Sequence, residues 1–213
     1  MPPEYNFHSI NQRIGVVPNS WPLVPDTYSE KKRLELIRLA GFEIVQVNPI
    51  EMARRVVGKA GYKRIVSVSY APEIFSCTSF VRWVYAQWGI ELPVFAIDQS
   101  KCGIEVSIDN LMTGDLVFAK GRLPQYDLDP LQGVGHVGII TDRGTVLHTT
   151  NLHVDQPAGL AETSFQHFYK NEEYFRTARR ILPLGGFYTL AIPKDMDILC
   201  SNDVQRKILQ YLA

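Results

Sequence analysis

The sequence has little cysteine, no long apolar run and no excess of charge of either sign. Its 213 residues include three cysteines, Cys77, Cys102 and Cys200, too few and too scattered for a disulfide framework. No Cys-x-x-Cys pair suggests a zinc site. No stretch reaches the roughly 18 apolar residues that a membrane-spanning helix needs, so we expect no transmembrane segment.

The balance of charge bears on the partners of the protein. Lys and Arg together number 22, as do Asp and Glu, so the formal net charge is zero. Such a chain has no global field to collect nucleic acid or anionic lipid, and we expect neither as a main partner. The N-terminus lacks a basic stretch followed by an apolar core, which leaves two locations open, the cytoplasm or export by a signal-independent route.

The composition of the N-terminal part of the chain predicts an arm. Five prolines among residues 1–28 interrupt any helix, so this stretch is expected to be irregular and to dock through Trp21. The arm is also a candidate contact for an unidentified protein partner.

Hydrophobic periodicity indicates an α+β fold. Helices are expected over residues 29–39, 50–57, 77–88 and 203–212, and strands over residues 115–119, 136–141, 145–149, 179–182 and 187–192. Most helices thus precede an antiparallel sheet. Residues 120–135, rich in Gly, Pro and Asp, predict a long loop at the rim of a binding site.

Cys77 lies in the first turn of the expected helix that ends before Gly89. Unpaired backbone N–H groups and the positive end of the helix dipole favour thiolate over thiol there. A free cysteine is otherwise often a small buried hydrophobe, and this interpretation suits Cys102 and Cys200 better. Cys77 is therefore the candidate nucleophile, and we expect its pKa to be lowered.

Two histidines on neighbouring strands supply a candidate base. If residues 142–144 form the hairpin loop with Gly144 in a left-handed conformation, Thr141 faces Thr145 and Gly138 faces His148. His136 then lies on the same face as His148, at a diagonal position that long side chains bridge. A two-residue loop would put the histidines on opposite faces.

A metal site is the other interpretation of paired histidines. No third ligand recurs at suitable spacing, and Asp142 belongs to the turn, so we expect no metal and no cofactor. His8, His153 and His167 are interpreted as incidental, although His153 is near enough in sequence to line a rim.

Four segments in order resemble the NlpC/P60 cysteine peptidases. They are residues 76–81 (SCTSFV), 114–118 (GDLVF), 135–140 (GHVGII) and 146–148 (VLH), and residues 178–182 (ARRIL) look like the closing strand of that family. The resemblance covers about residues 49–183. It implies a catalytic domain over these residues, with an N-terminal arm or extension at residues 1–48 and a C-terminal strand and helix extension at residues 184–213. It implies a papain-like α+β fold with the nucleophile at a helix N-terminus packed on an antiparallel sheet.

The resemblance also implies an activity. Such enzymes cleave amide bonds in bacterial cell-wall peptides, commonly between a γ-D-glutamyl group and a diamino acid, through a thioester. By motif match Cys77 is the nucleophile, His136 the general base and His148 the residue that orients it. Tyr70, seven residues before Cys77, matches a family tyrosine beside the nucleophile and is a candidate for substrate binding.

This sequence departs from the family pattern immediately before the nucleophile. Ser76 stands where the family usually has an aspartate that can pair with a free substrate amine, so Ser76 is a candidate specificity residue. Ser76 could equally cap the helix, with Asp98 or the loop at residues 120–135 supplying the charge. Two other functions use the same fold: an amidase or acyltransferase, and a catalytically silent interaction module.

Overall fold

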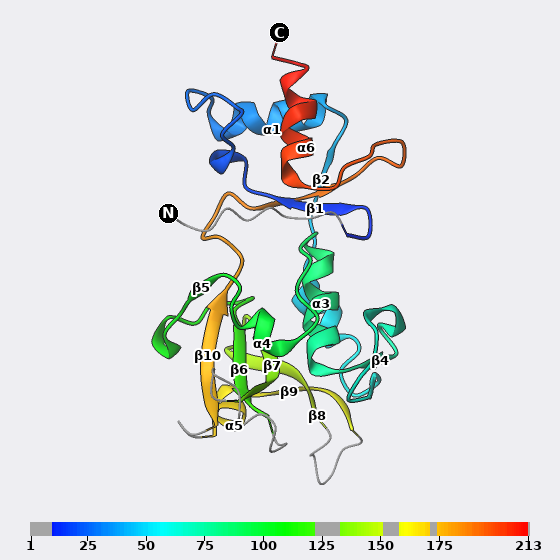
Figure 1. Ribbon diagram of the computed structural model, residues 1–213, viewed down its shortest axis with the longest axis vertical. Coiled ribbons are helices and arrows are strands. Elements are labelled where there is room, and N and C mark those ends of the chain that lie inside the picture. The colour runs from blue at the N-terminus through cyan, green and yellow to red at the C-terminus, as the bar shows by residue number, and fades with distance from the viewer. Residues whose placement is uncertain (1–9, 122–132, 151–157, 171–173, 213) are drawn as a thin grey trace. The chain divides into compact units, whose positions relative to one another are not determined.

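The computed structural model describes residues 10–121, 133–150, 158–170 and 174–212 (Figure 1). The chain folds into two compact units. The first comprises Met1–Asn48, Tyr85–Glu91 and Pro183–Ala213, and the second comprises Pro49–Val84 and Leu92–Leu182. In these described ranges, we find no helix with the length and apolar character that a membrane crossing requires. The domain boundaries expected from the sequence stay a prediction.

A three-stranded antiparallel sheet forms the centre of the first unit. Strand β11 lies between the other two, in the order β1-β11-β2. The elements of this unit are β1 (Arg13–Val16), η1 (Pro18–Ser20), α1 (Glu30–Leu39), β2 (Glu43–Val45), β11 (Tyr188–Ala191) and α6 (Ser201–Leu209). Helices α1 and α6 confirm the helices expected near both ends of the chain. Helix α1 begins where the Ser29 hydroxyl accepts a hydrogen bond from the Lys32 N–H.

The proline-rich segment is more ordered than the sequence indicates, because it contains β1 and surrounds a buried guanidinium. Arg33 is 3% exposed and donates hydrogen bonds to the carbonyls of Pro18 (2.8 Å), Tyr28 (3.1 Å) and Pro25 (2.9 Å). Two of these carbonyls also accept a backbone hydrogen bond, that of Pro18 from Trp21 N–H (3.4 Å) and that of Pro25 from Tyr28 N–H (3.0 Å). The expectation of an irregular arm is therefore wrong for residues 13–16 and 18–20, which form β1 and η1.

The second unit is built on a curled sheet of eight strands among the described residues. Their order is β4-β3-β9-β8-β7-β6-β10-β5, and every neighbouring pair is antiparallel except β3 and β4. The strands are β3 (Gly61–Tyr62), β4 (Ile74–Phe75), β5 (Ile104–Glu105), β6 (Leu116–Lys120), β7 (Val134–Ile140), β8 (Thr145–Thr150), β9 (Gly159–Ser164) and β10 (Phe175–Arg180). The α+β fold expected from the sequence is confirmed, with one parallel pair added.

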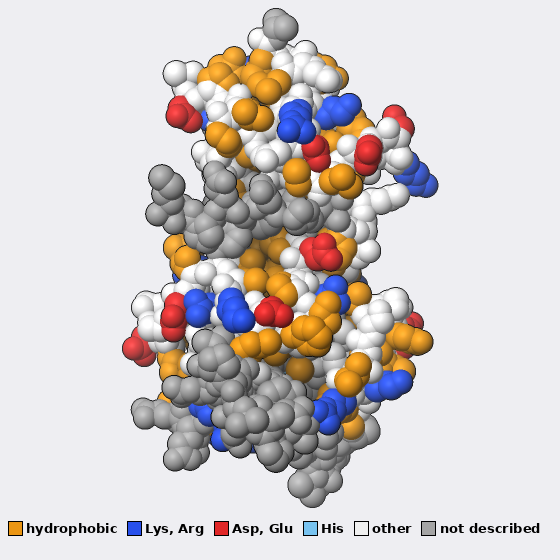
Figure 2. All heavy atoms as spheres, viewed as in Figure 1, with side chains coloured by type: hydrophobic (Ala, Val, Ile, Leu, Met, Phe, Trp, Pro, Cys, Tyr) orange, Lys and Arg blue, Asp and Glu red, His pale blue; other side chains and the backbone are white. Residues whose placement is uncertain are grey.

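Short helices accompany this sheet. They are α2 (Pro49–Arg54), η2 (Val68–Tyr70), α4 (Ala96–Gln99), η3 (Ile108–Asn110) and α5 (Phe165–Tyr169). Helix α3 (Cys77–Gln87) begins in the second unit, and its residues from Tyr85 onward group with the first. On the face that Figure 2 shows, basic and acidic side chains are interspersed, as the zero net charge would suggest.

A buried ion pair fixes the strands at one side of this sheet. Arg180 on β10 donates to both carboxylate oxygens of Asp115, at 2.8 and 2.7 Å, and to the carbonyl of Asn110 at 2.6 Å. Asp115 is 2% exposed and also accepts a hydrogen bond from the Met112 N–H. The pair therefore joins the end of β10 to the turn that precedes β6.

We expect Asp115→Ala to lower the free energy of unfolding by about 3–5 kcal/mol, because it leaves the Arg180 guanidinium buried without its partner. Urea denaturation would measure the change. Lys101→Ala is a matched control, because it removes a solvent-exposed ion pair with Asp98 and should cost no more than about 1 kcal/mol. Equal effects of the two substitutions would contradict the structural role of the buried pair.

Candidate active site

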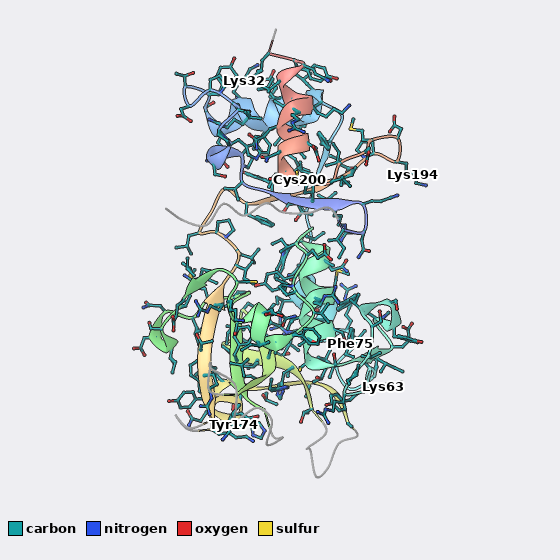
Figure 3. The ribbon with its side chains drawn as sticks, in the orientation of Figure 1. Lys32, Lys63, Phe75, Tyr174, Lys194 and Cys200 are labelled. Atoms are coloured by element: carbon teal, nitrogen blue, oxygen red, sulfur yellow. The ribbon has the colours of Figure 1, made fainter. Side chains whose placement is uncertain are left out.

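Cys77 is the first residue of helix α3, and the residues around it hold it there. The Ser79 N–H donates to the Ser76 hydroxyl at 3.2 Å, and the Ser76 N–H donates to the Ser79 hydroxyl at 2.8 Å. This reciprocal pair acts as a capping box with serine in the third position. Phe75, labelled in Figure 3, is buried and packs edge-on against Phe80 of the helix, with ring centroids 5.5 Å apart. The cap and this contact fix the first turn.

Strands β7 and β8 have the register that the sequence predicts. Ile139 pairs with Leu147, and the Thr141 N–H donates to the Thr145 carbonyl at 2.9 Å. Gly144 has φ +68°, the left-handed conformation required by a three-residue loop. The three-residue hairpin loop is therefore confirmed, and with it the face shared by the two histidines.

The two histidines contact each other directly. His136 Nε2 lies 3.0 Å from His148 Nδ1, and their ring planes meet at 76°. Phe168 of α5 stacks on the His136 ring at 5.5 Å and meets the His148 ring edge-on at 5.2 Å. These contacts restrict both imidazoles to one orientation.

Gly138 is needed for this packing even though its backbone conformation is not unusual. A Cβ atom at Gly138 would lie 2.4 Å from Val146 Cγ1 and 3.2 Å from His148 Cβ. Any larger residue would therefore displace the strand that carries His148.

The sequence alone did not reveal one further contact of the pair. His148 Nε2 lies 3.1 Å from the hydroxyl of Thr163 on β9. The sequence pattern predicts no strand over residues 158–164, and Thr163 belongs to no recognisable motif. Only the strand pairing of β8 with β9 reveals that this hydroxyl is close to His148.

The environment of the Cys77 thiol corrects one expectation. Burial raises the pKa of this thiol above its usual value, while hydrogen bonds with the backbone of Val137, Thr78 and Cys77 itself act in the opposite direction. The cost of enclosing a negative charge thus outweighs the helix N-terminus, and the expected lowering was wrong. Because Val137 follows His136 on β7, the thiol lies against the strand that carries the candidate base.

Cys77, His136 and His148 line one cleft with a volume of about 630 Å³. Ser76 also lines it but is only 5% exposed, and its hydroxyl is engaged in the helix cap. Tyr70 is 59% exposed and is not among the described residues that line the cleft. The structure therefore brings together four of the five predicted site residues.

Among the described residues, the charged side chains that line the cleft are all basic. Arg64, Lys120 and Lys170 line it, and no Asp or Glu does so among the described residues. Asp98, considered from the sequence as a source of negative charge, is not in this lining and pairs with Lys101 at 3.4 Å. His153 and most of the expected loop over residues 120–135 lie outside the described residues.

No group of three or more His, Cys, Asp or Glu side chains in the described ranges could hold a metal ion. The described residues that line the cleft thus include a thiol, three imidazoles, hydroxyls and cationic side chains. The third imidazole belongs to His167, which was interpreted from the sequence as incidental. A thiol beside an imidazole pair can perform nucleophilic attack and proton transfer without further groups.

The second unit is thus an α+β domain that carries a cysteine and a histidine pair in one cleft. The family model described as NlpC/P60 family matches residues 67–178, more than half of the chain. The chain belongs to the NlpC/P60 family.

Two curated relatives extend the comparison. The chain is 30% identical over 138 residues to peptidoglycan DL-endopeptidase CwlO of Bacillus licheniformis, which is 62% of this chain and 27% of that protein. It is 31% identical over 80 residues to a protein of Corynebacterium glutamicum named "Probable endopeptidase", which is 38% of this chain and 33% of that protein. The chain thus matches about a quarter to a third of the length of these relatives.

Solved structures of the family are more distant in sequence. NlpC2 from Trichomonas vaginalis is 21% identical, with a TM-score of 0.46 over 65% of this chain and 49% of that chain. The NlpC/p60 domain of peptidoglycan hydrolase SagA is 24% identical, with a TM-score of 0.44 over 63% of this chain and 99% of that chain.

We expect Cys77 to react with iodoacetamide at neutral pH at least about tenfold faster than Cys102 or Cys200, because of the three only Cys77 lines the cleft with His136, the proposed acceptor of its proton. His136→Ala should abolish this advantage, since burial then opposes an isolated thiolate. Mass spectrometry of the labelled peptides measures each rate in the folded protein. Cys102, whose pKa is raised by burial and by Asp98, serves as an internal control that His136→Ala should not change.

Proposed function

We propose that this protein is a cysteine hydrolase that cleaves amide bonds in cell-wall peptides. The observation that carries the proposal is the presence of Cys77, His136 and His148 along one cleft, with the two imidazoles 3.0 Å apart. Membership of the NlpC/P60 family and the names of the curated relatives support the choice of substrate.

The proposed reaction follows from the groups in the cleft. The Cys77 sulfur attacks the amide carbonyl while the thiol proton passes to His136. The thiolate thus forms in an ion pair with the His136 imidazolium and is not an isolated buried charge. Collapse of the tetrahedral intermediate breaks the C–N bond, and His136 gives its proton to the leaving amine. Water activated by His136 then hydrolyses the thioester, releasing a carboxylate and the free thiol. The backbone N–H groups at the start of α3 are suited to stabilise the oxyanion.

The charge of the cleft supports a substrate that carries carboxylates. Arg64, Lys120 and Lys170 complement such groups, and cell-wall peptides have carboxylates near their γ-glutamyl and diamino-acid residues. The finer proposal is therefore cleavage between a γ-D-glutamyl group and a diamino acid. Tyr70 does not line the cleft, so the proposed mechanism does not involve it.

An acyltransferase is the second candidate, because apolar side chains border the same cleft. Ile65, Val94 and Phe95 line it and are 82%, 54% and 66% exposed. Exposed apolar groups of this size are suited to bind an apolar acceptor or acyl group. Product analysis with and without an added amine or alcohol distinguishes acyl transfer from hydrolysis.

We expect the protein to cleave defined muropeptides, as measured by mass spectrometry of the products. Cys77→Ala should abolish turnover, and His136→Ala should lower kcat/KM by about 10²–10⁴-fold, the usual contribution of a general base. His148→Asn should cost only about ten- to a hundredfold, because it removes one hydrogen bond to a charged ring. Cys102→Ala is the control and should retain full activity. Unchanged turnover in Cys77→Ala would overturn the mechanism.

Selectivity for a free substrate amine should be weak. Ser76 stands in place of the usual aspartate, and no described residue that lines the cleft offers a carboxylate for a charge-assisted hydrogen bond worth about 1.5–3 kcal/mol. We therefore expect N-acetylation of a muropeptide to change kcat/KM by less than about tenfold, and Ser76→Asp to raise the preference for the free amine. Strong rejection of the acetylated peptide by the wild type would contradict this prediction.

A further inference from the structure

The Thr163 hydroxyl ends a chain of hydrogen bonds that begins at His136. His136 Nε2 lies 3.0 Å from His148 Nδ1, and His148 Nε2 lies 3.1 Å from Thr163 Oγ1. His148 is 6% exposed, so its ring nitrogens depend on protein groups for hydrogen bonds. We propose that Thr163 is a positioning residue whose oxygen keeps the proton of neutral His148 on Nε2, an inference that rests on the proposed role of His136 as the base.

The proton positions follow from the base role of His136. Its Nε2 is engaged by His148, so the proposed role as base assigns the thiol proton to Nδ1. Neutral His136 must therefore carry its own proton on Nε2 and donate it to His148 Nδ1. His148 Nδ1 must then be the nitrogen with the lone pair, which places the proton of His148 on Nε2, directed at Thr163.

The opposite arrangement would disable the base. If the Thr163 hydroxyl donated to His148 Nε2, the His148 proton would move to Nδ1 and be donated to His136 Nε2. His136 would then carry its proton on Nδ1, where the thiol proton has to go. An accepting oxygen at Thr163 thus selects the one tautomer of His148 that leaves His136 able to act.

Strand pairing explains why the Thr163 hydroxyl lies within hydrogen-bonding distance of His148. His148 faces Ala161 on β9, and Thr163 is the next residue on the same face, at the diagonal position. Ala161 is too small to cover the imidazole ring, which leaves the approach to Thr163 open. The β-branched side chain of Thr163 has few rotamers, so its oxygen is held with little loss of entropy.

The test compares Thr163→Val with Thr163→Ser by ¹⁵N NMR of the histidine rings. In wild type and Thr163→Ser, neutral His148 should carry its proton on Nε2, whereas Thr163→Val should shift the proton toward Nδ1. Thr163→Val should also raise the midpoint pH of Cys77 alkylation. With the His148 proton on Nδ1, an imidazolium at His136 would direct its Nε2 N–H at the N–H of His148, so two donors would face each other. At neutral pH the alkylation rate should fall about tenfold, the equivalent of ~1.4 kcal/mol.

Other titratable groups along the cleft are the same in both variants, so they cannot account for a difference between them. These groups are Tyr62, Arg64, Lys120, His167, Lys170 and Tyr174. Thr177→Val is the control for loss of a threonine hydroxyl elsewhere in the sheet, where it removes a hydrogen bond to Glu105. It should leave both the tautomer and the midpoint pH unchanged.

The proposal is overturned if Thr163→Val keeps the wild-type tautomer and midpoint pH, or if Thr177→Val shifts them equally. Failure of the proposed function is a separate result. A wild-type protein that cleaves no muropeptide refutes the substrate, while the NMR and alkylation measurements still judge Thr163, because neither requires a substrate.

Discussion

The hydrogen bond between His136 and His148 is the contact on which the rest of the site depends. Successive side chains of a strand point to opposite faces, so a shift of one residue in the pairing of β7 with β8 would separate the two rings. The turn at Gly144 fixes that pairing, and the missing side chain of Gly138 lets the strands approach. Two glycines thus determine whether the two imidazoles meet.

Because the Cys77 thiol is enclosed, the proposed role of the imidazole pair includes providing a positive charge beside the thiolate. In an exposed site, the helix N-terminus alone would favour the thiolate, but burial here raises the thiol's pKa. In the proposed mechanism the thiolate forms beside an imidazolium, so the nucleophile arises together with the acid that later protonates the leaving group.

Local sequence patterns predicted the parts of the fold that local interactions determine. The helices α1, α3 and α6 and the hairpin of β7 and β8 have periodic apolar residues, caps and a turn glycine, which act within a few residues. The same signals predicted four residues of the cleft, namely Ser76, Cys77, His136 and His148.

Elements held by distant partners could not be predicted in this way. Strand β1 lies in a proline-rich stretch and exists because it pairs with β11. The two-residue strands β3 and β4 are too short to show a period. Thr163 needed the pairing of β9 with β8, and the pKa of Cys77 depends on how closely the thiol is enclosed, which no spacing of residues encodes.

The position of β11 in the first unit has a consequence for the order of folding during synthesis. Strands β1 and β2 emerge early from the ribosome but do not pair with each other, since each pairs with β11, whose residues are made nearly 150 positions after β2. The backbone groups of β1 and β2 stay unpaired until β11 has been synthesised. Closing the long loop between β2 and β11 is slow. Ribosome-bound chains that stop short of β11 would therefore expose two unpaired strand edges, a form that chaperones bind and that aggregates readily.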